Sequence, residues 1–177
     1  MTPTEYNIES KKFERTLPPR EAVFHALVGL CGETGEYLTE RDVDKKHEEA
    51  GDVFWYLFCL DRALAEYTSH RAVLAAFDED EDEDEDYLDL RGESVGIQAL
   101  LLSERVKKSM YARRPLTTPS TDKTLAPRLV CFARTLLEDY YLHVKEACLP
   151  VNHPRSVDLS TILEKSIEKL TRRMVVG

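Results

Sequence analysis

Two pairs of acidic residues share one spacing within the segment from residue 29 to residue 57. Glu33 and Glu36 stand three positions apart, and so do Glu49 and Asp52. Side chains three positions apart lie on the same face of a helix, so each pair can direct its carboxylates toward one place. Four negative charges at close range need a compensating cation, and a set of oxygen ligands suits Mg²⁺ or Mn²⁺. The pattern therefore indicates a site for a hard divalent metal ion.

The alternative is a solvated helix face on which the spacing arises by chance, because Asp and Glu make up 33 of the 177 residues. The context favours the metal site. The acids are interleaved with apolar residues, and Glu49 and Asp52 share a helical stripe with Tyr56. Gly32 and Gly35 keep the first helix open beside its acids, which leaves the room that a phosphate ligand needs next to a metal.

Two helices are expected to carry these acids. Apolar residues recur near every 3.6 positions over 20–40 and over 46–77, and a short polar connection joins the two segments. A short connection favours antiparallel packing, which would bring the four carboxylates to one spot in the groove between the helices. Gly29, Gly32 and Gly35 each weaken the first helix by about 1 kcal/mol relative to alanine, so their presence needs a structural reason.

The rest of the chain also favours helices. Three further helices are expected over 94–113, 125–148 and 159–174, whereas the first 18 residues, which end at Pro18, are expected to be an irregular lead-in. The 177 residues, 42% of them apolar, suffice for one core, and strand-like alternation is hard to find. The predicted fold is all-α, a bundle of about five helices.

Charge is concentrated in one block of nine consecutive acids, Asp78–Asp86. Like charges at that density repel, so the block is expected to form a solvated linker; a weak cation buffer or a bait for a basic partner is the alternative. The remaining acids and bases number 24 each, which argues against binding of duplex nucleic acid. No long uncharged apolar window occurs and the N-terminal segment is polar, so we expect no membrane span, no secretory signal and a cytoplasmic protein.

A resemblance to a known family is carried by GLCGETGEYL at 29–38 and KKHEEAGDVFWYL at 45–57. The two segments resemble the MazG-like branch of the all-α nucleoside triphosphate pyrophosphohydrolases, whose pattern is ExxE, a gap of a dozen or more residues, and ExxD. Twelve residues separate the two pairs here, and Ala50 stands where leucine is common. FERT at 13–16 and VDLSTILEKSIEKLTRRM at 157–174 are similar to the family's lead-in and closing helix, although Ser166 stands where asparagine is usual.

The resemblance implies hydrolysis of a nucleoside triphosphate between its α and β phosphates, with Mg²⁺ as the cofactor and Mn²⁺ as an alternative. It implies Glu33 as the base that takes the proton of the attacking water, and Glu33, Glu36, Glu49 and Asp52 as metal ligands, although base and ligand roles could trade places. Positive charges must also meet the departing pyrophosphate. The candidates for that phosphate and nucleotide contact are Lys46, Lys107, Lys108, Arg113, Arg114 and Lys169.

The resemblance also suggests how the chain is organised. Residues 103–116 resemble the segment that often follows the family's GExGE, so we expect a diverged second copy without the acids, an internal duplication with one degenerate half; a simple insertion is the alternative. Residues 1–77 would form the MazG-like half with the carboxylates, 78–92 the acidic linker and 93–177 the second helical half, all within one bundle. The expected partners are the nucleotide substrate and a second copy of the chain in a homodimer.

Two other functions stay open at this point. The chain could be a non-catalytic helical interaction or scaffold protein derived from the same fold, an alternative suggested by the half without acids. It could also hydrolyse another pyrophosphate-containing nucleotide, such as a dinucleotide polyphosphate or an alarmone, since only the shape of the pocket would separate these substrates.

Overall fold

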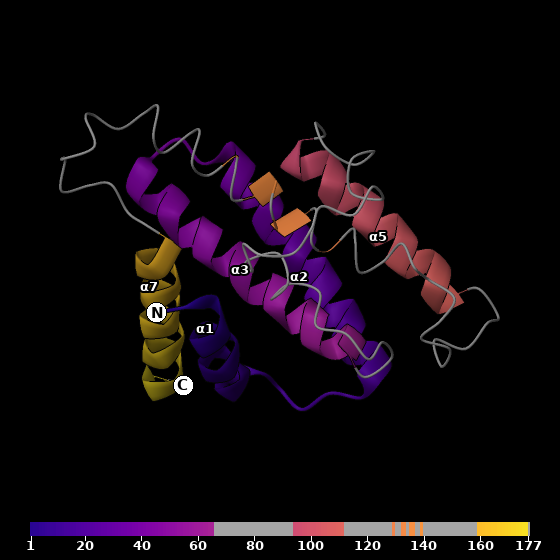
Figure 1. Ribbon diagram of the computed structural model, residues 1–177, viewed down its shortest axis with the longest axis horizontal. Coiled ribbons are helices and arrows are strands. Elements are labelled where there is room, and N and C mark those ends of the chain that lie inside the picture. Colours follow the sequence, from indigo (N-terminus) through magenta and orange to yellow (C-terminus); the bar gives the residue numbers. More distant parts are fainter. Residues whose placement is uncertain are drawn as a thin grey trace.

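The protein is an all-α bundle. The computed structural model describes residues 1–65, 94–111 and 159–176, together with the single positions 129, 132, 133, 135, 136 and 139, all six of which are helical. Five α-helices and one short 3-10 helix, with no strand, occupy these described parts of the chain (Figure 1). The fold class expected from the sequence is thereby confirmed.

Two antiparallel helices form the centre, α2 over Pro19–Thr39 and α3 over Val43–Ala65. The chain reverses between them because Glu40 leaves the helix with extended backbone, and its carboxylate accepts hydrogen bonds from the backbone N–H of Arg41 (2.7 Å) and Asp42 (2.8 Å). The Asp42 carboxylate in turn accepts from the backbone N–H of Lys45 at 3.1 Å, which caps the new helix. That cap explains why α3 begins three residues before the predicted start at 46. The predicted end of this helix at 77 lies outside the described residues.

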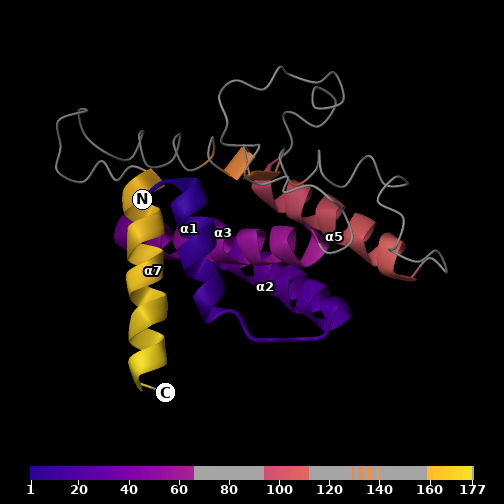
Figure 2. The same cartoon turned by 60° about the horizontal axis from the view of Figure 1, so that its bottom comes forward.

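The core lies between α2, α3 and α5, the helix over Val95–Tyr111. α5 packs on the side of α2 away from α7, the helix over Leu159–Val176 (Figures 1 and 2). The Tyr37 hydroxyl donates to a carboxylate oxygen of Asp139 at 2.8 Å, so at least one of the six isolated helical positions also packs on α2. The largest fully buried apolar side chains at this centre include Leu30, Phe54, Leu57, Phe58, Leu60 and Leu102.

The expectation of an irregular first segment is wrong, because α1 forms over Pro3–Ser10 and a 3-10 helix follows over Lys11–Phe13. The Thr2 hydroxyl accepts from the backbone N–H of Glu5 at 3.2 Å, and the Glu5 carboxylate accepts from that of Thr2 at 2.7 Å; this capping box stabilises the first turn. The Tyr6 side chain is fully buried and packs its ring 5.3 Å from that of Phe58 on α3. Tertiary packing thus holds a helix that is short by itself.

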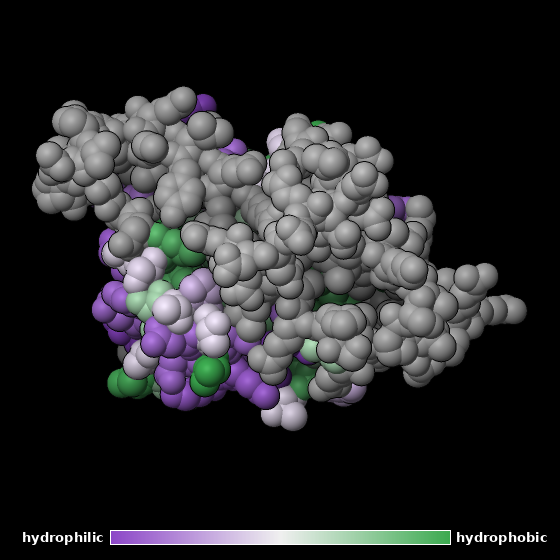
Figure 3. Space-filling view, in the orientation of Figure 1, coloured by the Kyte–Doolittle hydropathy of each residue, from purple (hydrophilic) through white to green (hydrophobic). Residues whose placement is uncertain are grey.

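α7 lies across α3, with α1 beside it and both chain ends close to it (Figures 1 and 2). Its buried stripe contains Ile162, Leu163, Ser166 and Leu170, and the surface over α1 and α7 is mainly hydrophilic (Figure 3). The α-amino group of Met1 contacts Glu164 at 2.5 Å, which ties the start of the chain to this helix.

Three of the predicted features fall on residues outside this description. They are the acidic linker at 78–92, most of the helix expected over 125–148, and the end of the helix expected over 94–113. Of the helices that the structure does describe, none has the length and the apolar character needed to cross a membrane.

Candidate functional site

The antiparallel packing of α2 and α3 brings together three of the four predicted carboxylates. One oxygen each of Glu33, Glu36 and Glu49 lies within 4.8 Å of the other two. Glu33 and Glu49 are half-buried, whereas Glu36 is exposed. The three residues, called the carboxylate cluster below, come from two helices and meet only because the connection at residues 40–42 reverses the chain.

Asp52, the fourth predicted acid, is held by α7. Its residue is 7% exposed, and the Lys169 ammonium donates a hydrogen bond to its carboxylate at 2.6 Å. A buried charge needs such a partner, since an unpaired carboxylate loses its hydration without compensation. Asp52 still acts on the cluster, because its charge raises the pKa of Glu33. The structure therefore places Lys169 at the border of the cluster.

The cluster carries more negative charge than its surroundings balance. The pKa of Glu33 is raised to about 7, first by burial and then by the charges of Asp52, Glu36 and Glu49, while the charge of Lys169 opposes the rise. Burial also raises the pKa of Glu49, against the opposing charge of Lys169. A cation placed among these carboxylates would relieve the repulsion and lower both pKa values.

The donor set fits a hard divalent ion. Mg²⁺ binds oxygen ligands at about 2.1 Å, so two ligands of one ion lie about 3 to 4 Å apart. The oxygens of the cluster lie within 4.8 Å of one another, and small side-chain rotations would close the difference. All three side chains offer carboxylate oxygens, the ligand type that magnesium and manganese favour.

Gly51 and Ser166 let α7 come close to the cluster. A Cβ atom at Gly51 would lie 3.2 Å from the Cβ atom of Ser166, so glycine is what allows this separation. The Ser166 hydroxyl lies 2.9 Å from the Tyr6 hydroxyl and donates to the Gly51 carbonyl at 3.3 Å. Ser166, which stands where the resemblance leads one to expect asparagine, is therefore committed to buried contacts, and Lys169 follows it by one turn.

The other residues that were predicted to contact phosphate do not lie together in the structure, and some of them fall outside the described residues. The Lys46 ammonium lies 4.7 Å from the centre of the Tyr37 ring, a cation–π contact on the α2–α3 pair. Lys107 is exposed on α5, and no described contact joins it to the cluster. The side chain of Lys108 and the whole of Arg113 and Arg114 lie outside the described residues.

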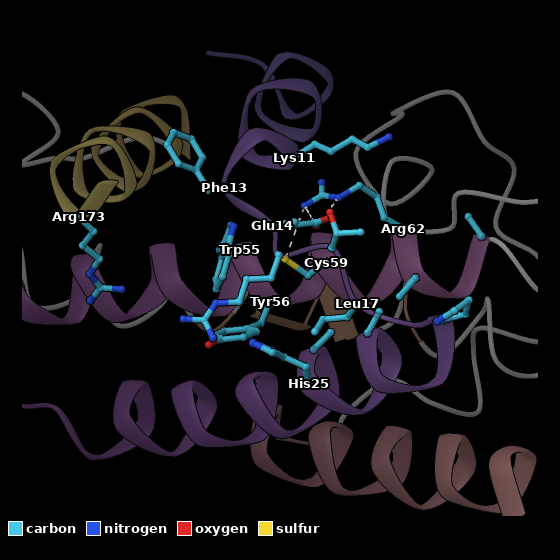
Figure 4. Close-up of a pocket in the computed structure, with 17 residues that line it drawn as sticks. Lys11, Phe13, Glu14, Leu17, His25, Trp55, Tyr56, Cys59, Arg62 and Arg173 are labelled. Atoms are coloured by element: carbon cyan, nitrogen blue, oxygen red, sulfur yellow. Dashed lines mark hydrogen bonds and ion pairs between the residues drawn. The ribbon is translucent and has the colours of Figure 1, made fainter. Parts of the chain in front are cut away.

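A pocket of about 750 Å³ opens along α3 beyond the cluster (Figure 4). Tyr56 connects the two, since it lines the pocket and the charge of Glu33 helps to raise its pKa, after burial. Gly29 makes room for this ring, because a Cβ atom there would lie 2.0 Å from Cε1 of Tyr56. The close approach is the structural reason for this glycine, whereas nothing lies within 4 Å of a Cβ built at Gly32 or Gly35.

Sequence reasoning missed this pocket as a unit. Its lining also contains Phe13, Arg15 and His25, which the chain brings together only through the fold of the first 18 residues. The basic residues on either side of the aromatic Phe13 in KKFER at 11–15 are the signal that could have pointed to it.

Comparisons of the chain with protein-family models, with curated proteins and with solved structures found no match. A function for the protein must therefore be argued from its own residues and from the resemblance of its two acidic motifs to the MazG-like pattern.

Proposed function

We propose that the protein hydrolyses a nucleoside triphosphate to the monophosphate and pyrophosphate, with magnesium held at the carboxylate cluster. The observation that carries the proposal is the meeting of Glu33 and Glu36 with Glu49 within 4.8 Å. Asp52 and Lys169 border that cluster. The acids that match the ExxE and ExxD motifs of the MazG-like resemblance are Glu33, Glu36, Glu49 and Asp52, and the first three of them meet in the cluster, which supports the proposal.

Glu33, Glu36 and Glu49 would hold the ion, with manganese as a substitute and Asp52 as a further ligand implied by the resemblance. Bound magnesium would neutralise the triphosphate and increase the acidity of a water molecule beside it. The Lys169 ammonium, fixed by Asp52 at 2.6 Å, would offer a charge-assisted hydrogen bond to an arriving phosphate oxygen.

The reaction needs one proton acceptor at the cluster. The water oxygen forms a bond to the α phosphorus while the bond from that phosphorus to the bridging oxygen breaks, and pyrophosphate departs with the electron pair. The water proton goes to a carboxylate, for which we propose Glu33. Glu33 is the base that the resemblance implies, and its carboxylate lies within 4.8 Å of those of Glu36 and Glu49, which would share the ion with it.

A cytoplasmic location and a homodimer belong to the same proposal. Phe24 and Val28 on α2, together with Leu100 on α5, keep more than half of their surface exposed, which gives a second copy an apolar surface to cover. Light scattering on the purified chain, with Phe24→Asp beside it, tests the dimer: the wild type should have twice the mass of one chain.

Matched glutamine variants test the assignment of the cluster. Glu36→Gln should abolish magnesium-dependent turnover of nucleoside triphosphates, because it removes one ligand charge. Glu48→Gln removes a carboxylate from an exposed neighbour of Glu49 and should retain turnover. Equal activity of the two variants would contradict the assignment.

A further inference from the structure

Lys169 places a positive charge at the border of the carboxylate cluster. Its ammonium lies 2.6 Å from a carboxylate oxygen of Asp52, and the side chains of the lysine and the aspartate are 21% and 9% exposed. Burial raises the pKa values of Glu33 and Glu49, and the charge of Lys169 opposes the rise at both residues. The ammonium therefore acts on the cluster as well as on Asp52, and it supplies part of the positive charge that the acids need.

The backbone of α7 is fixed next to this lysine. Ser166 precedes Lys169 by one turn and is buried, with its hydroxyl 2.9 Å from that of Tyr6 and 3.3 Å from the carbonyl oxygen of Gly51. A Cβ atom at Gly51 would lie 3.2 Å from that of Ser166, so α3 and α7 are already in close contact here. With α7 held in this way, Lys169 leaves Asp52 by rotation of its own side chain, and that rotation gives up a hydrogen bond between two charged groups.

Asp52 differs from the three glutamates in the space around its carboxylate. Among the residues that the structure describes, the oxygens that lie within 4.8 Å of one another belong to Glu33, Glu36 and Glu49, and Asp52 is not a member of this group. Glu36 is exposed and the other two glutamates are half-buried, so water can reach an ion among them. Mg²⁺ usually keeps several of its water molecules when it binds to a protein. At Asp52, whose side chain is 9% exposed, a hydrated ion would have to take the place of the ammonium.

The charges at the site also favour one ion. The four acids carry four negative charges when they are ionised, and one divalent ion together with the Lys169 ammonium supplies three positive charges. A second divalent ion at Asp52 would raise the positive charge to five, and it would lie beside an ammonium of the same sign. Like charges repel more strongly at a partly buried position than in water, because less water screens them.

We propose that Lys169 takes the place of a second metal ion. In the protein without nucleotide, the carboxylate cluster binds one divalent ion, while Asp52 stays paired with Lys169 and does not join the ligands. The inference rests on the proposed function and departs from the resemblance at one point, because the resemblance implies Asp52 as a ligand. Removal of the ammonium should therefore open a second metal position between Asp52 and the cluster.

Electron paramagnetic resonance with Mn²⁺ counts the ions without any turnover. Free Mn²⁺ in water gives a sharp signal that is lost when the ion binds, so titration of the full chain gives the number of bound ions. The double variant Glu36→Gln/Glu49→Gln supplies the baseline for ions held elsewhere, for instance by the acidic run at 78–86. Wild type should bind one ion above this baseline.

Lys169→Met keeps a long unbranched side chain and removes the charge, so this variant should bind two ions above the baseline. Two ions that share carboxylates lie about 3.5 to 4 Å apart, and their spins should couple in the spectrum. Lys165→Met is the matched control, because Lys165 is exposed one turn earlier on α7, and it should bind one ion as wild type does. Circular dichroism establishes that each variant is folded.

A second pair of variants tests the inference while Lys169 is kept. Asp52→Asn should change the affinity for the ion by less than about threefold, because the ammonium already offset the charge that is lost. Glu49→Gln should weaken the affinity at least about tenfold, because the cluster loses a charged ligand. This comparison decides the question if Lys169→Met does not fold.

Two ions above the baseline in wild type would overturn the inference, as would a loss of affinity in Asp52→Asn as large as that in Glu49→Gln. A folded Lys169→Met chain that still binds one ion would overturn it as well. In each of these cases the cluster binds metal, so the proposed function stands and is tested separately by hydrolysis of triphosphates with the wild type. A wild type that binds no more ions than the baseline would contradict the metal site itself, and with it both the inference and the proposed function.

Discussion

The Lys169 ammonium on α7 donates to the Asp52 carboxylate on α3 at 2.6 Å, across 117 positions of the chain. This pair fixes α7 against α3, the helix that carries Glu49 of the carboxylate cluster. It also means that one of the four predicted acids is already compensated by a cation of the chain itself, whereas the other three make no ion pair with any residue that the structure describes.

Removal of the Lys169 amine should cost stability. Lys169→Gln leaves a buried carboxylate with a weaker partner, so we expect a loss of about 2 kcal/mol in the free energy of unfolding, less than for a fully buried pair because the lysine is partly exposed. Urea unfolding of the metal-free protein measures it. Lys165→Gln, at an exposed site on the same helix, should change stability by no more than about 0.5 kcal/mol. Equal losses in the two variants would contradict a structural role for the pair.

Neutralising Glu33 should stabilise the metal-free protein. The pKa of Glu33 is raised to about 7 in the folded state, so between about pH 4.5 and 7 the folded chain binds more protons than the unfolded one, and stability falls as pH rises through this window. Glutamine does not ionise, so the Glu33→Gln variant does not lose stability in this pH window. Because the carboxyl is partly exposed, we expect a gain of about 1 kcal/mol at pH 8 and none at pH 4, measured by urea unfolding at both values. A gain of equal size at the two pH values would show that ionisation of Glu33 is not its cause.

Magnesium should bind with release of protons. Glu33 and Glu49 have raised pKa values, and a cation favours their charged forms, so the apparent affinity should increase as pH rises from about 5.5 to 7.5. Calorimetry in two buffers of different ionisation enthalpy measures the number of protons released. Addition of a chelator should reverse the stabilisation that magnesium provides, and a pH-independent affinity would exclude these carboxylates as the ligands.

Replacement of two glycines of α2 by alanine should change the stability of the protein in opposite directions. Gly29→Ala places a Cβ atom 2.0 Å from the Tyr56 ring, so the ring must move, and we expect a loss of about 1 to 3 kcal/mol. Gly32→Ala meets open space and should gain about 0.5 to 1 kcal/mol from helix propensity. Thermal unfolding of the two variants checks both signs, and a stabilised Gly29→Ala protein would contradict the packing of Tyr56.

The helical period of the apolar and acidic residues was enough to predict the central pair of helices and the convergence of the three carboxylates of the cluster. The acids at 33, 36 and 49 converge because both helices keep their register over a connection of three residues. Local patterns of this kind depend on residues close in sequence, and such residues determine helix faces directly.

The features that the sequence patterns missed depend on packing between segments far apart in the chain. The capping box of Thr2 and Glu5 is local, but α1 also needs the burial of Tyr6 against α3 and α7, which no local pattern contains. The pairing of Asp52 with Lys169 and the pocket lined by Arg15 and Trp55 likewise depend on segments far apart in the chain.

Hydrolysis in ¹⁸O-labelled water tests the central proposal most directly. The purified chain is incubated with each of the eight common nucleoside and deoxynucleoside triphosphates and magnesium. The products are separated, and their masses are measured by mass spectrometry. The account predicts monophosphate and pyrophosphate in equal amounts, with the label in the monophosphate, because water attacks the α phosphorus. Label in pyrophosphate, or release of diphosphate and inorganic phosphate, would contradict it, as would eight intact triphosphates together with no binding of magnesium to the cluster.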